Sequence, residues 1–270
     1  MINPLRIVIV GASGKMGQTL INEISKDPEL LLTGAIDQSS STDLGIDAGA
    51  LFGIKTDVII NDDFKSIIKT GDYVIDFTRP KASMRYLEEC VENNIKYVLG
   101  TTGFSDEEKE KISLASKKIP ICFAPNMSVG VNVLVSLVQA ATEVLHQNYD
   151  IEVIESHHRD KVDSPSGTAL RLGETIAKTA NLNLKENGVF HREGKMEKRK
   201  KNEIGFSTIR AGDIVGDHTV LYAGAGERIE LTHKAGNRST FAIGAIKAVH
   251  FLTNHSVGLF DMADVLNLKK

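Results

Sequence analysis

IVIVGASGKMG, at residues 7–17, is the stretch of this sequence that sets the expected fold. A β-branched run typical of a buried strand leads directly into glycines at positions 11, 14 and 17, and a helical pattern follows. Glycines let a backbone come close to a pyrophosphate, and the amide N–H groups of a helix N-terminus bind its charge. The spacing is GxxGxxG rather than GxGxxG, and an ordinary structural turn would look similar. The strand–turn–helix context is therefore what favours dinucleotide binding.

Outward from this stretch, the first half of the chain alternates short apolar runs with helical patterns. The predicted strands are 6–10, 31–36, 73–77, 97–99 and 121–123, and the predicted helices among them are 16–25, 83–93 and 106–117. Such alternation predicts a parallel sheet covered by helices on both faces. Ser105, followed by Glu108 three residues later, is typical of a capped helix start.

Three further features of this half are candidate cofactor contacts. Asp37 follows the second predicted strand, 20 residues after Gly17, where an acidic side chain accepts hydrogen bonds from a ribose; an Asp there is also an ordinary turn residue. The loops GTTG (100–103) and APNM (124–127) follow the fourth and fifth predicted strands. Since ligands bind beyond the carboxyl ends of parallel strands, these loops are candidates to wrap the nicotinamide half, although Gly and Asn also belong in ordinary turns.

The pattern changes after Asn126. A long helix is predicted at 129–147, a strand at 151–157, a helix starting at Ser164-Pro165, three strands at 204–210, 215–222 and 228–233, and a last helix at 240–252. The three strands are close in sequence, with glycine-containing turns between them, which predicts a second, mostly open sheet. At 270 residues the chain fits one or two domains, and this change of pattern favours two.

The stretch ESHHRDKVDSPSGT, from Glu155 to Thr168, has the densest set of donors in the chain. It combines two histidines, a lysine and an arginine with a small-residue helix start that can bind a carboxylate through its N–H groups and the Thr168 hydroxyl. Paired histidines also suggest a metal. Adjacent residues on a strand point to opposite faces, however, and no HExxH or CxxC completes a ligand set, so we predict no metal site.

Composition limits the classes of function. Hydrophobic residues make up 41% and charged residues 25%, the net charge is −3 and the pI is about 6.3, so neither nucleic acid nor an anionic membrane is an expected partner. Cys90 and Cys122 form no CxxC, no signal-peptide pattern is visible, and the apolar stretch at 129–138 is too short to cross a bilayer, so we expect a cytoplasmic protein. The basic run KMEKRKK (195–201) is best interpreted as a solvated loop, with phosphate binding as the less favoured alternative.

The stretch at 155–168 resembles the signature ExHHxxKxDxPSGT of the 4-hydroxy-tetrahydrodipicolinate reductase family. The resemblance extends to GASGKMG at 11–17, DFTRP at 76–80, GTTGF at 100–104, APNMSVGVN at 124–132, RAGDIVGDHTV at 210–220 and GLFDM at 258–262. It implies an α/β fold with a Rossmann-like, doubly wound parallel-sheet domain (1–128 with 238–270). It also implies an α+β domain for substrate binding and oligomerisation (129–237), in a homotetramer.

The resemblance also implies roles for individual residues. His157 and Lys161 are the expected acid/base residues, with His158, Gly167 and Thr168 as substrate contacts. Arg79 is expected near the cofactor. Contacts with NADH or NADPH fall on Gly11, Ala12, Ser13, Gly14, Lys15, Met16, Asp37, Gly100, Thr101, Thr102, Ala124, Pro125, Asn126 and Met127.

The implied reaction reduces 4-hydroxy-tetrahydrodipicolinate to tetrahydrodipicolinate, with loss of water, on the route to diaminopimelate and lysine. Hydride addition to the imine-containing ring requires a general acid, which His157 and Lys161 can supply, and two substrate carboxylates require fixed donors. The family often has a basic residue after the acidic one, where this chain has Asp37-Gln38; we therefore expect NADH to be used at least as well as NADPH, with Lys15 as the nearby cation. The alternatives are another two-domain dehydrogenase, or a dinucleotide sensor without catalysis, which would lack the acid/base residues.

Overall fold

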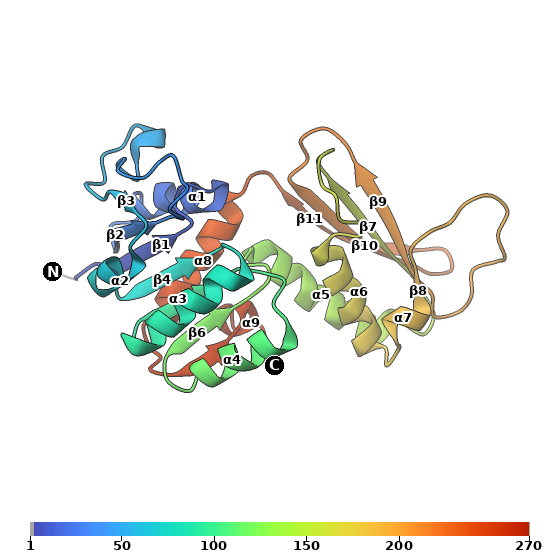
Figure 1. Cartoon of the computed structure of the whole chain (residues 1–270). Helices are drawn as coiled ribbons and strands as arrows, with labels where there is room; N and C mark the ends of the chain where they lie inside the picture. Colours follow the sequence, from blue (N-terminus) through green and yellow to red (C-terminus); the bar gives the residue numbers. More distant parts are fainter. Residues whose placement is uncertain (1–2, 270) are drawn as a thin grey trace. The chain divides into compact units, whose positions relative to one another are not determined.

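The computed structural model describes residues 3–269, and these form two compact units (Figure 1). Unit 1 combines the chain up to Val129 with the returning segment from Arg238 onward, and unit 2 is Gly130–Asn237.

Unit 1 contains a seven-stranded sheet in the order β12-β6-β5-β4-β1-β2-β3, in which every neighbouring pair is parallel. The strands are β1 (Leu5–Val10), β2 (Leu30–Ile36), β3 (Ile60–Asn61), β4 (Tyr73–Asp76), β5 (Lys96–Leu99), β6 (Pro120–Phe123) and β12 (Gly258–Phe260). The helices are α1 (Lys15–Ile24), α2 (Phe64–Ile67), α3 (Pro80–Glu92), α4 (Asp106–Ala115), α8 (Ser239–Leu252) and α9 (Met262–Val265), with 3-10 turns η1 (Ala50–Phe52) and η2 (Ile68–Thr70).

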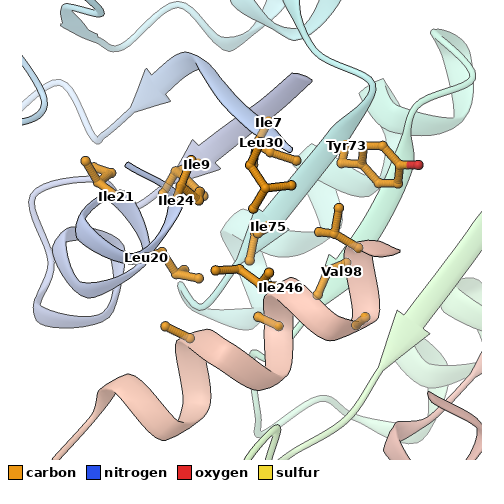
Figure 2. Close-up of a cluster of buried hydrophobic side chains, with 14 of the residues drawn as sticks. Ile7, Ile9, Leu20, Ile21, Ile24, Leu30, Tyr73, Ile75, Val98 and Ile246 are labelled. Carbon is orange, nitrogen blue, oxygen red and sulfur yellow. The ribbon is translucent and has the colours of Figure 1, made fainter. Parts of the chain in front are cut away.

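Both faces of this sheet are covered. Alternate residues of β1 belong to different cores: Ile7 and Ile9 pack with residues of α1 and α8, whereas Val8 and Val10 pack with residues of α3 and α4. Figure 2 shows the first of these cores, with Ile246 of α8 beneath the sheet. A strand buried on both faces must be apolar at every position, which explains the unbroken run at the start of the chain. The predicted doubly wound sheet is confirmed.

Two of the three glycines in the first loop are required by the fold. Gly11 has φ of 72°, which favours glycine, and a side chain there would meet Thr78 Cγ2 at 2.8 Å. A side chain at Gly17 would meet the carbonyl oxygen of Gly11 at 2.2 Å, so this glycine allows α1 to pack closely on the loop after β1. These are the turn and helix-packing roles that glycines have in dinucleotide-binding loops.

Unit 2 has a mixed sheet in the order β11-β10-β7-β9-β8. Its strands are β7 (Asp150–His157), β8 (Gly188–Val189), β9 (Ile204–Arg210), β10 (Gly216–Ala223) and β11 (Arg228–Ala235), and its helices are α5 (Val129–Leu145, from Gly130 onward), α6 (Gly167–Thr179) and α7 (Leu184–Asn187). Residues of α5 and α6 share a core with one face of the sheet. This separate sheet with helices on one face confirms the predicted fold class.

Two features of unit 2 matter for the site, and the first corrects a sequence prediction. Helix α6 begins at Gly167 rather than at Ser164-Pro165, because the Ser166 side chain caps it by accepting the Ala169 N–H. Strand β7 lies between β9 and β10, which are consecutive in sequence, and pairs parallel to β9 and antiparallel to β10. The strand that ends at His157 is therefore at the centre of its sheet.

Candidate functional site

The glycine loop of unit 1 lies where the strand order reverses, between β1 and β4. Among the described residues, Gly14 provides the N-cap of α1 without a side-chain hydrogen bond, and the first turn contains no acidic residue. The N–H groups of this turn therefore have no side-chain competitor for an anion. Ala12 is buried behind the loop, Met16 is half-buried and Lys15 is exposed.

Asp37 lies against this loop. Its carboxylate accepts the N–H of Ser13 at 2.7 Å and the N–H of Gln38 at 2.7 Å. The Ser13 hydroxyl lies 3.0 Å from that of Ser41. The structure therefore brings Asp37 to the glycine loop, 24 residues away in sequence, as the prediction requires.

The loops after β4 and β5 meet at a buried carboxylate that the sequence analysis did not assign. Asp76 accepts hydrogen bonds from the N–H of Thr78 at 2.7 Å, from Thr101 Oγ1 at 3.2 Å and from the Tyr97 hydroxyl. The sequence feature that could have identified Asp76 is its place in the DFTRP motif, as an acidic residue at the end of an apolar strand. Thr101 is thus held by the protein, and its side chain shapes the loop.

The remaining predicted cofactor contacts in these loops divide by exposure. Thr102 and Pro125 are exposed and Asn126 is half-buried, whereas Gly100, Ala124 and Met127 are buried. A side chain at Gly100 would overlap the Phe77 ring at 2.2 Å, so this glycine is needed for packing. Arg79 is exposed at the N-cap of α3, next to Thr78, which adjoins the glycine loop.

In unit 2, His157 ends β7 and is 8% exposed. Its Nδ1 lies 2.5 Å from Oε2 of Glu155, two residues earlier on the same face of the strand. Because a carboxylate only accepts, Nδ1 must carry a proton, and Nε2 is the nitrogen left for proton exchange. Burial lowers the pKa of His157 below its usual value, and Glu155 opposes this only in part.

Lys161 and His158 lie beside this histidine in sequence. The Lys161 ammonium pairs with Asp163 at 2.7 Å and the side chain is 22% exposed, while His158 is half-buried. Lys161 also adds to the electrostatic potential at His157, where it disfavours the imidazolium. The two predicted catalytic residues are therefore close enough to interact.

The N-terminus of α6 joins the same cluster. The Ser166 N–H donates to Glu155 Oε1 at 3.0 Å, and the Ser166 hydroxyl lies 3.0 Å from Nε2 of His218. Gly167 is exposed, and a side chain there would meet no atom within 4 Å, so the space above this helix start is open. Thr168 is half-buried in the first turn.

Three residues of this cluster were not assigned by the sequence analysis: Glu155, Arg210 and His218. Arg210 donates to both oxygens of Glu155 at 2.8 Å. The His218 ring lies 5.1 Å from that of His157, and burial lowers the pKa of His218 to about 4. All three residues stand in the motifs that carried the resemblance, but the motifs did not indicate their roles.

Outside these two clusters, a group of side chains in the described part of the chain has the geometry of metal ligands. One cluster has three side chains that could ligate an ion together: Asp27, Glu29 and His250 in unit 1. His250 Nε2 is 3.5 Å from Asp27 and Nδ1 is 3.9 Å from Glu29, so each ring nitrogen faces a different carboxylate, as in a simple ion-pair arrangement. Within residues 3–269, no helix is long and apolar enough to cross a membrane.

Unit 1 has a doubly wound sheet with an open glycine-rich helix start, and unit 2 has a buried His–Glu pair and a second open helix start. This arrangement is the one expected of a two-unit dinucleotide-dependent oxidoreductase. Residues 5–127 match the family model described as dihydrodipicolinate reductase, N-terminus, and residues 130–266 match the one described as dihydrodipicolinate reductase, C-terminus. The chain belongs to the 4-hydroxy-tetrahydrodipicolinate reductase family of the diaminopimelate and lysine route.

Individual relatives agree with this assignment. The chain is 52% identical to the 4-hydroxy-tetrahydrodipicolinate reductase of Paraburkholderia phymatum over 265 residues, which cover 98% of this chain and 100% of the relative. It is also 52% identical to that of Nitrosomonas eutropha, covering 98% and 99%. The dipicolinate-bound dihydrodipicolinate reductase from Paenisporosarcina sp. TG-14 shares the fold, with a TM-score of 0.78 at 24% identity over 97% of this chain and 98% of that chain. The predicted family and enzyme class are confirmed, and membership implies a nicotinamide cofactor.

Proposed function

We propose that this chain reduces 4-hydroxy-tetrahydrodipicolinate to tetrahydrodipicolinate, with loss of water, and that His157 and Lys161 supply the acid/base chemistry. The observation that carries the proposal is the His157–Glu155 pair. One ring nitrogen is committed to a buried carboxylate at 2.5 Å, which leaves Nε2 as a single, oriented site for a proton. A bound NADH or NADPH supplies the hydride.

The low pKa of free His157 fits this role once substrate charge is included. Burial lowers the pKa, so the ring is largely neutral near pH 7 before substrate binds. A cyclic dicarboxylate brings two negative charges, and nearby negative charge favours the imidazolium. Substrate binding would thus load the proton that Nε2 later donates. Lys161, which disfavours that charge in the free chain, would be neutralised by the same carboxylates.

We assign substrate binding to the start of α6 and the loop before it. The N–H groups of Gly167 and Thr168 and the Thr168 hydroxyl face one carboxylate, and His158 and Lys161 bind the other. Helix starts and ammonium groups are suited to this, because both present donors to an anion. The open space at Gly167 supports the assignment.

Cofactor binding is proposed for unit 1, with the residues from Gly11 to Met16 on the pyrophosphate and Asp37 on the adenosine ribose. The loops at 100–102 and 124–127 would hold the nicotinamide half. The exposed Gln38 adds no charge beside Asp37, so NADH should serve at least as well as NADPH.

The assembly that we propose is a homotetramer built on the sheet of unit 2. On the face opposite α5 and α6, Ile154 is paired with Thr219, and Ile209, which is 47% exposed, is paired with Ser156. This face would bury apolar side chains against a second copy. We further propose that the enzyme acts in the cytoplasm, with its biosynthetic pathway, and binds neither nucleic acid nor membranes.

The test is cofactor oxidation with enzymatically generated 4-hydroxy-tetrahydrodipicolinate, for the wild type, His157→Gln and Lys161→Ala. Loss of a positioned acid/base group should lower kcat by about 10²- to 10⁴-fold with little change in melting temperature. Exhaustive chelation should leave the rate unchanged, since no metal is assigned to this site. Near-normal kcat in both variants would show that the protonation chemistry lies elsewhere. Turnover of a different hydroxy or amino acid, or binding without turnover, would favour another dehydrogenase or a sensor.

A further inference from the structure

We propose that Glu155 and Arg210 are positioning residues, which hold His157, the Lys161 loop and the start of α6 in one arrangement. The inference rests on the proposed roles of those groups in the reaction. Neither Glu155 nor Arg210 needs to touch the substrate for it.

Glu155 is the centre of the arrangement. It is 1% exposed, and its two oxygens accept from His157 Nδ1 at 2.5 Å, from Ser166 N at 3.0 Å and from both terminal nitrogens of Arg210 at 2.8 Å. Thr208 Oγ1 adds a longer contact at 3.4 Å. Burial alone would raise the pKa of Glu155, but the hydrogen bonds from Arg210 and His157 outweigh it and keep the carboxylate ionised. One charged group therefore connects the proposed acid to the proposed carboxylate-binding helix start.

Arg210 extends the arrangement to the Lys161 loop. Its Nε donates to the carbonyl oxygen of Lys161 at 3.2 Å, and its Nη2 donates to that of Asp163 at 2.5 Å. The guanidinium that makes these backbone contacts also forms the bidentate hydrogen bonds to Glu155. Only arginine has enough donors in a fixed plane to make them together, so a lysine would keep the charge and lose the geometry.

The other face of β7 offers a matched comparison. Glu152 is also bonded to arginines, with Arg192 donating to its two oxygens at 2.9 and 3.0 Å and Arg199 donating as well. Residues 152 and 155 are three apart on one strand, so they face opposite sides. Among the described residues, Glu152 is hydrogen-bonded to Arg192 and Arg199, neither of which is a proposed catalytic group. Loss of either carboxylate removes a carboxylate–arginine contact from the same strand, but only the loss of Glu155 should change His157.

The expected change has a definite sign. Four titratable or charged groups face His157: Glu155 on its own strand, Lys161 in the following loop, Arg210 on β9 and His218 on β10. Two further groups act on these neighbours: Asp163 pairs with Lys161, and His233 on β11 lowers the pKa of His218. Of those on His157, Glu155 favours the imidazolium, and Lys161 and Arg210 oppose it. Replacing Glu155 by Gln removes the favourable charge, so the pKa of His157 should fall further. Activity that needs the protonated ring should then decline at lower pH.

The experiment compares wild type, Glu155→Gln and Glu152→Gln. Three quantities are measured: kcat, the pH dependence of kcat/KM, and the His157 titration by NMR of ¹³C-labelled histidine, assigned with His157→Gln. Glu155→Gln should lower kcat by about 10- to 100-fold, the effect of losing a partner that orients a histidine. The titration and the alkaline limb should move to lower pH together. Glu152→Gln lies on the face proposed for assembly, so its oligomeric state is checked by size-exclusion chromatography; with the assembly intact it should match the wild type in all three.

Arg210→Lys is a second variant that tests the inference if Glu155→Gln does not fold. The Arg210 side chain is less buried than that of Glu155, and lysine preserves the positive charge. It should weaken binding of pyridine-2,6-dicarboxylate and lower kcat, while cofactor affinity stays unchanged. If Glu155→Gln or Arg210→Lys behaves like Glu152→Gln, the positioning role is overturned. If the His157 titration moves but the rate profile does not, the positioning role stands and His157 is not the acid of the proposed function.

Discussion

Neighbouring histidines at the end of β7 have different surroundings. His157 is buried against Glu155, whereas His158 follows the last strand residue and is half-buried. Adjacent positions on a strand alternate between faces, so a single ESHH stretch can give one fixed acid and one residue for a ligand.

Gly216 provides a test of the proposed role of His157 Nε2 as the proton-exchanging atom. A methyl group at this position would lie 3.0 Å from Nε2 of His157. Glu155 binds the other ring nitrogen, Nδ1. Gly216→Ala should therefore lower kcat by about tenfold or more, because it crowds the proton-exchanging nitrogen, with little change in melting temperature. Gly236→Ala is the control, since a side chain there meets no atom within 4 Å. Equal kcat in the two variants would exclude Nε2 as the reacting atom.

In the proposed cofactor site, the preference between NADH and NADPH should depend on the residues beside Asp37. Gln38→Arg should shift the ratio of kcat/KM values toward NADPH, because an arginine can bind a 2′-phosphate with two hydrogen bonds. Lys15→Ala should weaken NADPH more than NADH, and both ratios should be measured at one ionic strength, because exposed phosphate contacts are salt-sensitive. A wild-type preference for NADPH above about tenfold, or roughly 1.4 kcal/mol, would require another cation. Arg79, exposed beside the loop that adjoins Gly11, would be the next residue to replace.

At the scale of single elements, the two open helix starts are built differently. Helix α1 begins after a glycine with no capping side chain, whereas α6 is capped by Ser166, whose N–H and hydroxyl are both used inside the protein. The α6 start is therefore held rigidly while its first residue, Gly167, stays exposed. Such a start suits a small carboxylate, because the donors are fixed before the ligand arrives.

Gly167→Ala tests this assignment without disturbing the protein. The added methyl group meets no atom within 4 Å, and alanine is favoured over glycine in helices by up to about 1 kcal/mol, so stability should be unchanged or higher. Binding of pyridine-2,6-dicarboxylate, measured by calorimetry, should weaken by about tenfold or more, and Thr168→Val should raise KM for substrate more than KM for the cofactor. A defect limited to cofactor binding would contradict the assignment.

Local signals explain which elements could be predicted from sequence. The capping box at Ser105 was predicted and is present, because it depends on residues three apart. The long strands and helices of unit 1 were found for the same reason. The short strands β3, β8 and β12 were not, since two or three residues carry no periodicity and pair only because the tertiary fold brings them together.

At the scale of the whole molecule, the pairing of strands that are far apart in sequence could not be predicted from local patterns. An open sheet was predicted without its strand order; in the structure β7 pairs between β9 and β10, and this brings Arg210 beside Glu155. The quoted motifs contained both residues, yet 55 positions separate them. Their shared role depends on strand order, which local patterns do not specify. The return of the chain from unit 2 to complete unit 1 was expected only through the family resemblance.

The distribution of histidines with lowered pKa values predicts that acid weakens unit 2 before unit 1. Burial lowers the pKa values of His157, His218 and His233, all in unit 2, and that of His218 falls to about 4. Below pH 6.5 the unfolded chain therefore binds protons that the folded unit does not, and stability is lost as pH falls. For His218 alone the loss between pH 7 and pH 5 is about 2 kcal/mol.

Unit 1 should respond only at lower pH. Its carboxylates with lowered pKa values are Asp47, Asp72, Asp106 and Asp264, and their stabilising effect is lost only as pH falls below the ordinary value of 3.8. Hydrogen exchange, corrected for the intrinsic pH dependence, should show peptides of β7, β10 and β11 losing more protection at pH 5 than those of β1, β4 and β5. The two sets come from one molecule, so each controls for the other. Equal losses, or larger ones in unit 1, would mean that proton uptake by these histidines does not limit stability in this range.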